Sequence, residues 1–384
     1  MSSETSQSAK VTFAGALPPP VTGMTAMSAV ILEALSQYGP VHCDNWSRNK
    51  TIGGWRWKLV RGWGMIKTLL GLIRRGRVRG GVFYLPVSSG LGLFKDIALV
   101  STAKLLGYRI VIHHHTYAYI YKRDWRVAIL NRLVGSSGAQ VVHCDLMHRD
   151  FSNAYDARGE FLTVPPTIVS QQLPAVASQP HSDFRLGFLS NLSLAKGLDD
   201  AIATFELLAA SGTPVQLLLA GPCRGTEERK LIDAAAARWP ERVHYRGPVY
   251  DEAKASFFAG IDVFIFPTRN ESWGIVLSEA LTAGCPVIAR SRGCIPWIVR
   301  DHCGVVIDAE LDFAPIAAQQ IQNWIDSPAT HESARKAARI RSQELELDAD
   351  RELPEFARRM FAFADPRGDC KHERVNGLRL SSSG

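Results

Sequence analysis

Two glutamates, Glu271 and Glu279, are the residues of this chain whose types and spacing most clearly suggest chemistry. Between them lies Gly274, which is followed by good helix formers and then by a Gly-Cys-Pro stop signal. The N–H groups at Gly274, Ile275 and Val276 would open such a helix and form a site for an anion such as phosphate. Ionised carboxylates only accept hydrogen bonds, so two of them beside a phosphate suit the hydroxyls of a sugar or a ribose.

The segments around this pair indicate how it is positioned. Asp262–Pro267 is a short apolar run typical of a buried strand, and a second such run begins at Val287. Strand, loop, helix and strand make half of a parallel α/β layer, where ligands bind at the carboxyl ends of strands. The alternative, a helix cap at Glu271 and a solvated Glu279, is disfavoured because the strand, glycine and proline signals agree.

A lysine occupies a similar position earlier in the same half. Lys196 follows the predicted strand Arg185–Leu189 and precedes a predicted helix that starts at Gly197. Its ammonium group would lie where a phosphate binds, although an ordinary surface lysine is the alternative.

The N-terminal half begins in the same way. The predicted strand Lys10–Gly15 leads through a proline-rich loop containing Gly23 to a predicted helix, Thr25–Tyr38. Gly23 would let the backbone approach a ligand, and an ordinary turn is the alternative.

Three consecutive histidines, His113, His114 and His115, lie at the end of another predicted strand, Arg109–His113. Alternation along the strand places His113 and His115 on one side and His114 on the other. Three histidines suggest a metal, but no Asp or Glu lies nearby to complete a site, so we predict no metal.

These motifs resemble a known family. A Glu-x7-Glu motif between Pro267-Thr268 and Gly284-Cys-Pro-Val-Ile is similar to the donor-site signature of glycosyltransferase family 4. That family consists of retaining enzymes of the GT-B fold. The resemblance covers roughly residues 11–365 and implies an α/β architecture of two doubly wound Rossmann-like domains that face each other across a cleft.

The resemblance also implies residue roles. Glu271 would bind the donor sugar, Glu279 the ribose, Lys196 the diphosphate and His115 the transferred sugar. We therefore predict three catalytic residues: Glu271, His115 and Lys196. The predicted donor-binding residues are Gly23, Asn191, Lys196, Glu271, Gly274, Ile275, Val276 and Glu279. Asn191 stands where the family usually has an arginine, so the phosphate clamp is weaker or another cation, such as Arg269, completes it.

The alternation of predicted strands and helices indicates two domains, residues 10–166 and 183–348, with a linker at 167–182 and a disordered tail at 365–384. The resemblance implies that the first domain binds the acceptor and the second the nucleotide sugar. It also implies that a helix at 349–364 crosses back to the first domain.

Composition limits the class of protein. With 384 residues the chain is long enough for two domains, and it contains no apolar run long enough to cross a bilayer. The polar first residues lack a signal-peptide core. Seven scattered cysteines without a Cys-x-x-Cys pair favour reduced thiols, so we expect a cytoplasmic protein.

Positive charge is concentrated in one region. Asn45–Lys95 contains eleven Lys and Arg residues and no Asp or Glu, whereas the whole chain carries +7. Within the basic 48–79 region, Trp63, Ile66, Leu70 and Ile73 recur at helical spacing. Such a helix is typical of one that lies on an anionic membrane, and a core helix with a solvated basic end is the alternative. No motif supports nucleic-acid binding.

The predicted function is therefore transfer of a hexose-type sugar from a nucleoside-diphosphate sugar, as co-substrate, to a saccharide or lipid-linked saccharide acceptor in polysaccharide or lipopolysaccharide assembly. No further cofactor is predicted. The alternatives are a non-catalytic nucleotide-sugar-binding protein and an epimerase or phosphorylase of the same fold. A nicotinamide dehydrogenase is disfavoured because no Gly-x-Gly-x-x-Gly follows a strand.

Overall fold

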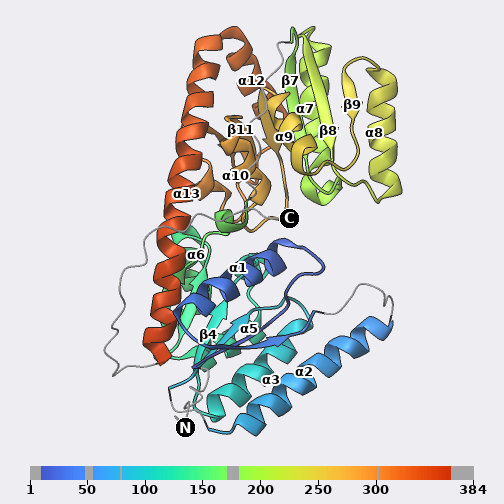
Figure 1. The fold of residues 1–384 in the computed structure, drawn as a ribbon. Coiled ribbons are helices and arrows are strands. Elements are labelled where there is room, and N and C mark those ends of the chain that lie inside the picture. Colours follow the sequence, from blue (N-terminus) through green and yellow to red (C-terminus); the bar gives the residue numbers. More distant parts are fainter. Residues whose placement is uncertain (1–9, 48–54, 78–79, 171–180, 301, 365–384) are drawn as a thin grey trace.

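The protein forms two layered α/β domains, one above the other in the computed structural model (Figure 1). The structure describes residues 10–47, 55–77, 80–170, 181–300 and 302–364, with side chains described from residue 64 onward in the second range. Most of the predicted linker and the whole predicted tail lie outside these residues.

The N-terminal sheet has six parallel strands in the order β2-β1-β3-β4-β5-β6. Its central strands are apolar and buried on both faces, as helices covering both sides of a parallel sheet require. The strands are β1 (Val11–Gly15), β2 (Val41–Asn45), β3 (Val82–Pro86), β4 (Arg109–His113), β5 (Ala139–Val142) and β6 (Glu160–Thr163). The helices are α1 (Gly23–Tyr38), α2 (Trp55–Arg75), α3 (Gly92–Leu105), α4 (Ala118–Tyr121), α5 (Trp125–Val134), α6 (Asp145–Tyr155) and η1 (Pro166–Val169).

The C-terminal sheet also has six parallel strands, in the order β12-β11-β10-β7-β8-β9. The strands are β7 (Phe184–Leu189), β8 (Val215–Ala220), β9 (Val243–Tyr245), β10 (Val263–Phe266), β11 (Val287–Arg290) and β12 (Gly304–Ile307). The helices are η2 (Leu194–Lys196), α7 (Leu198–Ala210), α8 (Thr226–Arg238), α9 (Asp251–Ala259), α10 (Ile275–Thr282), α11 (Ile295–Ile298), α12 (Phe313–Asp326) and α13 (Pro328–Ala364). Two doubly wound sheets confirm the predicted GT-B architecture.

Each sheet reverses its strand order at one point. In the C-terminal sheet the reversal lies between β7 and β10, and in the N-terminal sheet it lies between β1 and β3. Loops leave the carboxyl ends of neighbouring strands in opposite directions there, which opens a crevice for a ligand. The loops that carry Lys196, Glu271 and Gly23 all leave strands at these two switch points.

The two domains are joined by α13, which runs along both of them in Figure 1. The sequence predicted a separate crossing helix over 349–364, whereas the structure has one continuous helix of 37 residues that includes Pro354. Near its end, Phe356, Ala357 and Met360 are fully buried in the core of the N-terminal domain, beside Phe13 and Met27. The helix therefore belongs to both domains.

A second contact between the domains is apolar. Tyr117 and Cys144 of the N-terminal domain share one buried cluster with Trp273 and Cys294 of the C-terminal domain. The sulfur atoms of Cys144 and Cys294 lie 2.9 Å apart, and the six cysteines in the described residues are free thiols.

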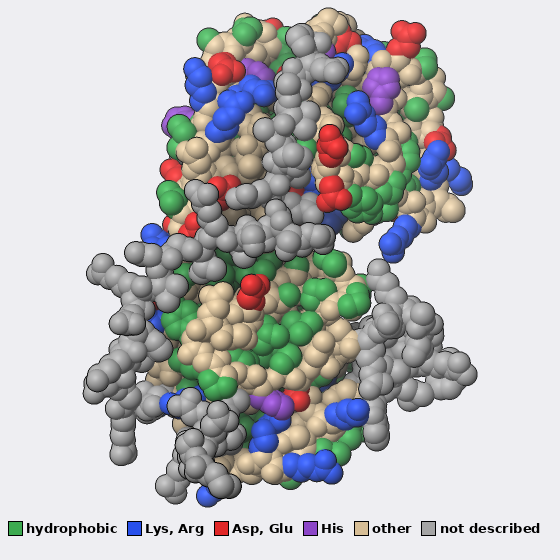
Figure 2. Space-filling view, viewed as in Figure 1, with side chains coloured by type: hydrophobic (Ala, Val, Ile, Leu, Met, Phe, Trp, Pro, Cys, Tyr) green, Lys and Arg blue, Asp and Glu red, His purple; other side chains and the backbone are tan. Residues whose placement is uncertain are grey.

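Helix α2 has one buried face and, apart from it, an exposed apolar stripe. Leu72 and Thr68 are buried, and Thr68 accepts a hydrogen bond from the indole of Trp46 at 2.9 Å. In contrast Ile66, Leu70 and Ile73 form a separate exposed stripe, 41%, 47% and 58% accessible. Figure 2 shows Lys and Arg side chains at the lower edge of the molecule, over α2 and α3. None of the described helices combines the length and apolarity that a membrane span requires.

Candidate active site

A cleft of about 560 Å³ opens between the two sheets at their switch points. Every predicted site residue lines it: Gly23, His115, Asn191, Lys196, Glu271, Gly274, Ile275, Val276 and Glu279. The carboxyl ends of parallel strands meet at one sheet edge, which brings together residues far apart in the chain.

The first feature of the cleft is a pair of lysine–glutamate contacts. Lys196 Nζ donates to Glu271 Oε2 at 2.8 Å and to the Asn270 carbonyl at 3.2 Å. Lys254 Nζ donates to Glu279 Oε1 at 2.7 Å. Both pairs are largely buried, so each lysine keeps its carboxylate partner from being an isolated buried charge.

Between these pairs lies the start of α10. Gly274, its N-cap, has a φ of 85°, and a Cβ there would come within 3.1 Å of Phe266 and Leu277. Only glycine adopts this backbone without strain, so it fixes the angle at which the helix leaves the loop. The first N–H groups of the helix lack partners within it and line the cleft, together with the positive end of the helix dipole.

Glu279 is the most buried carboxylate of the cleft, with 3% of its surface exposed. Burial raises its pKa above the usual 4.5, and the hydrogen bond and charge of Lys254 partly offset this shift. The buried Glu279 carboxylate is suited to accept hydrogen bonds from the hydroxyl groups of a bound ligand.

The N-terminal wall of the cleft faces α10 directly. Gly23, in the first turn of α1, lies so close to Ile275 that a Cβ on it would be 3.4 Å from the Ile275 side chain. The turn is held by a capping box in which Thr22 and Thr25 exchange backbone and side-chain hydrogen bonds. Two helix N-termini from different domains thus point into one cleft.

The three histidines divide as predicted from strand alternation. His113 and His115 lie together with ring centroids 3.9 Å apart, whereas His114 hydrogen-bonds Tyr119 and Gln140 on the opposite side. Burial lowers the pKa of His115 to about 3, so its ring is neutral at physiological pH.

The suggestion that Arg269 replaces the family arginine is wrong. Its guanidinium binds Asp199 at 2.7 Å and Asp200 at 2.8 Å, and it does not line the cleft. These carboxylates, in the first turn of α7, attract Arg269 away from the ligand side. Asn191 does line the cleft.

Among the other residues that line the cleft, sequence analysis gave no role to Lys254, His143 or Trp273. Lys254 lies in α9, which follows β9 at the same edge of the sheet, so its position carried a signal. His143 directly follows β5, and Trp273 lies within the Glu-x7-Glu segment. Neither was given a role because their proximity to His115 arises only in the folded chain.

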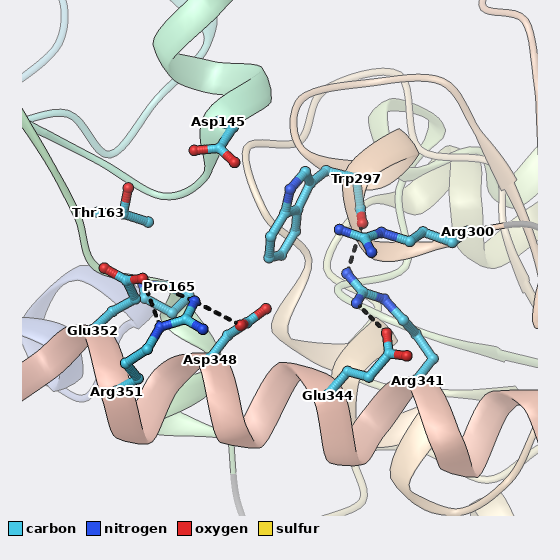
Figure 3. Close-up of a pocket in the computed structure, with 10 residues that line it drawn as sticks. All are labelled: Asp145, Thr163, Pro165, Trp297, Arg300, Arg341, Glu344, Asp348, Arg351 and Glu352. Atoms are coloured by element: carbon cyan, nitrogen blue, oxygen red, sulfur yellow. Dashed lines mark hydrogen bonds and ion pairs between the residues drawn. The ribbon is translucent and has the colours of Figure 1, made fainter.

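A second pocket, of about 340 Å³, lies where α13 passes from one domain to the other (Figure 3). Five of its charged groups pair with one another, Arg341 with Glu344 and Arg351 with both Asp348 and Glu352. No predicted site residue lines it, so the cleft remains the candidate active site.

Comparison with known families agrees with this geometry. Residues 170–341, which include both glutamates, match the family described as glycosyl transferases group 1. This part of the chain belongs to that family.

Relatives of this group 1 glycosyltransferase domain match over part of their length. The capsular polysaccharide biosynthesis glycosyltransferase CapM of Staphylococcus aureus is 27% identical over 161 residues, 40% of this chain and 40% of CapM. The D-inositol 3-phosphate glycosyltransferase of Pseudarthrobacter chlorophenolicus is 31% identical over 166 residues, 42% of this chain and 39% of the relative. The chain thus matches about 40% of the length of these relatives.

Solved structures match the chain across both domains. Sucrose-phosphate synthase from Thermosynechococcus elongatus has a TM-score of 0.69 at 16% identity, over 92% of this chain and 99% of its own. HepE from Anabaena, in complex with UDP, has a TM-score of 0.67 at 15% identity, over 92% of this chain and 100% of the HepE chain. These likenesses show the fold.

Proposed function

We propose that the protein is a retaining glycosyltransferase that moves a hexose-type sugar from a nucleoside-diphosphate sugar to a saccharide or lipid-linked saccharide. The observation that carries the proposal is the pair of lysine–glutamate contacts on either side of the α10 N-terminus. This arrangement provides cations and N–H donors for a diphosphate, and carboxylate acceptors for hydroxyls, within one cleft. HepE, which has the same fold, was solved with UDP and with UDP-glucose.

Each group has a role in this proposal. Lys196 and the α10 N-terminus bind the diphosphate, Glu271 orients the donor sugar, and Glu279 accepts hydrogen bonds from the ribose. When a donor binds, the lysines gain phosphate partners and the carboxylates gain hydroxyl partners. No divalent ion is needed at the diphosphate, because two lysines and a helix dipole offset its charge.

The transfer step needs no nucleophile from the enzyme. The bond between the anomeric carbon and the diphosphate oxygen breaks, and the acceptor oxygen bonds to that carbon on the same face. The proton of the acceptor passes to the leaving diphosphate. His115, neutral and half-buried on the N-terminal wall of the cleft, would contact the transferred sugar. Exclusion of water by the two domains protects the donor from hydrolysis.

The proposal is tested by thermal shift with UDP-, GDP- and ADP-sugars, followed by transfer to saccharide and membrane-lipid acceptors. One donor stabilises the protein and supports transfer with retained anomeric configuration, observed by NMR. Glu271→Gln lowers the transfer rate at least about 100-fold, because it removes a charged acceptor that orients the sugar. Glu310→Gln, on an exposed loop, is the matched control.

Two outcomes contradict the proposal. Full activity in Glu271→Gln removes the assigned role. Donor binding without transfer to either class of acceptor instead supports a non-catalytic binding protein, which the asparagine at position 191 would then explain.

A further inference from the structure

Three histidines form a cluster on the N-terminal wall of the cleft. His113 and His115 come from the end of β4, and His143 follows β5, the neighbouring strand. One ring nitrogen from each lies within 4.8 Å of the other two. Trp273, from the other domain, closes the cluster with its ring perpendicular to that of His143.

The nitrogen atoms at the centre of this cluster have no hydrogen-bond partner in the described residues. They are Nε2 of His113, Nε2 of His115 and both ring nitrogens of His143, all buried. Leaving such atoms unpaired costs about 1–3 kcal/mol each. By contrast His114, on the other side of the strand, has both ring nitrogens bonded.

A sugar hydroxyl in the cleft does not account for all three rings. His115 and His143 line the cleft, whereas His113 is fully buried behind them. A ligand that satisfies the three nitrogens together must sit among the rings rather than in front of them.

We propose that His113, His115 and His143 form a binding site for a divalent transition metal, with Zn²⁺ as the favoured ion. Imidazole is a preferred ligand of Zn²⁺, and three histidines with an open fourth position make a known type of zinc site. The sequence prediction of no metal rested on the lack of a nearby carboxylate, which a site of three imidazoles does not need.

The distances fit this ion after a small adjustment. Zn–N bonds of about 2.0–2.1 Å in tetrahedral geometry place ring centroids roughly 5 Å apart. The centroids of His143 lie 5.6 Å from His113 and 5.5 Å from His115. His113 and His115, at 3.9 Å, must separate by roughly 1 Å to reach this geometry.

One further contact orients the first ligand. Nδ1 of His113 lies 2.6 Å from the hydroxyl oxygen of Tyr84. When Nε2 binds the metal, Nδ1 carries the proton, and this N–H donates a hydrogen bond to the Tyr84 oxygen. Such outer contacts fix the tautomer and the orientation of a metal-binding histidine.

The site would contribute charge to the cleft. Three neutral ligands leave the full charge of the ion, which attracts an anionic donor, and the fourth position faces the cleft through His115 and His143.

The experiment measures metal rather than activity. The full-length protein is purified from zinc-supplemented medium, its zinc content is determined by mass spectrometry, and Co²⁺ is titrated into the chelator-treated protein. Wild type holds about one Zn²⁺ per chain, and Co²⁺ produces the visible absorption of a tetrahedral site. His143→Ala and His113→Gln lose both signals, and Tyr84→Phe weakens metal binding about 10–100-fold.

His148→Ala is the control, because His148 is an exposed histidine stacked on Phe161 outside the cluster. Circular dichroism of each variant checks that it is folded. The proposal is overturned if folded wild type takes up neither ion, which would leave a buried water as the partner of the three rings. It is equally overturned if the ligand variants retain as much zinc as His148→Ala. Donor binding in metal-free protein is measured separately, so loss of the metal site does not by itself contradict the glycosyltransferase assignment.

Discussion

At the scale of single residues, the cleft is organised by charges that pair before any ligand arrives. Glu271 and Glu279 each pair with a lysine, and the two lysines come from different helices of the C-terminal domain, Lys196 from η2 and Lys254 from α9. Arg269, which is adjacent in sequence to the glutamate loop, is held by aspartates instead. Proximity in sequence was therefore a poor guide to which cation serves the site.

Lys254 and Arg269 provide a matched pair of substitutions. Lys254→Met weakens donor binding by about tenfold or more, because a charge-assisted contact contributes about 1.5–3 kcal/mol. Arg269→Met changes the donor Kd by less than about twofold, since its partners Asp199 and Asp200 lie outside the cleft. Isothermal titration with the active nucleotide sugar measures both. A larger effect from Arg269→Met would return that arginine to the phosphate site.

The buried Glu279 predicts a pH dependence of donor binding. Burial raises the pKa of Glu279 above 4.5, so its carboxyl group becomes protonated at a higher pH than that of an exposed glutamate. Ribose hydroxyls need the ionised form, and donor affinity therefore falls as the pH drops through the raised pKa toward 4.5. Measured Kd values across this range show the decline in wild type. In Glu279→Gln the affinity is lower throughout and this part of the pH dependence disappears; an unchanged profile contradicts the ribose role.

At the scale of elements, α2 has one buried face and one face that is exposed to solvent. Leu72 and Thr68 pack it onto the domain, while the stripe of Ile66, Leu70 and Ile73 stays exposed beside Lys67 and Arg74. Arg75, which also belongs to the basic 48–79 region, instead binds Asp44 and contacts His42. We propose that this stripe lies on the inner face of an anionic membrane, where a lipid-linked acceptor would be found.

Vesicle binding tests this surface. Leu70→Glu reduces partition into anionic vesicles at least about tenfold, because it replaces about 1.5–3 kcal/mol of apolar burial by a like charge. Leu347→Glu is the control, since Leu347 is 68% exposed on α13. Flotation with anionic and with neutral lipids measures both variants. Equal binding of the two variants, or no binding by wild type, contradicts the proposal.

At the scale of the whole molecule, α13 makes the two domains one unit. Its final turns are buried in the N-terminal core, so they support the sheet that carries Gly23 and the histidines. Met360→Ala lowers the free energy of unfolding by about 2–5 kcal/mol, the usual cost of emptying a buried site. Arg351→Ala, on the same helix with only surface ion pairs, costs less than about 1 kcal/mol. Urea denaturation compares them, and equal effects would show that the helix end is not anchored.

The sequence by itself determined the doubly wound class and the central strands, and it predicted residues that the structure brings together in one cleft. Apolar runs and glycine and proline signals act locally, so they can be recognised in the sequence without knowledge of the tertiary structure. It did not reveal the partly exposed strands β2, β6 and β12, nor the continuity of α13 through Pro354.

Only the tertiary structure decided which residues meet. Lys254 reaches Glu279, His143 joins His113 and His115, and Gly23 approaches Ile275, all between segments that are distant in the chain. It also assigned Arg269 to the aspartates of α7 rather than to the cleft. The physical reason is that charges and ring nitrogens pair with whatever the parallel sheets bring to their common edge. That neighbourhood is set by strand order, which no local pattern of residues encodes.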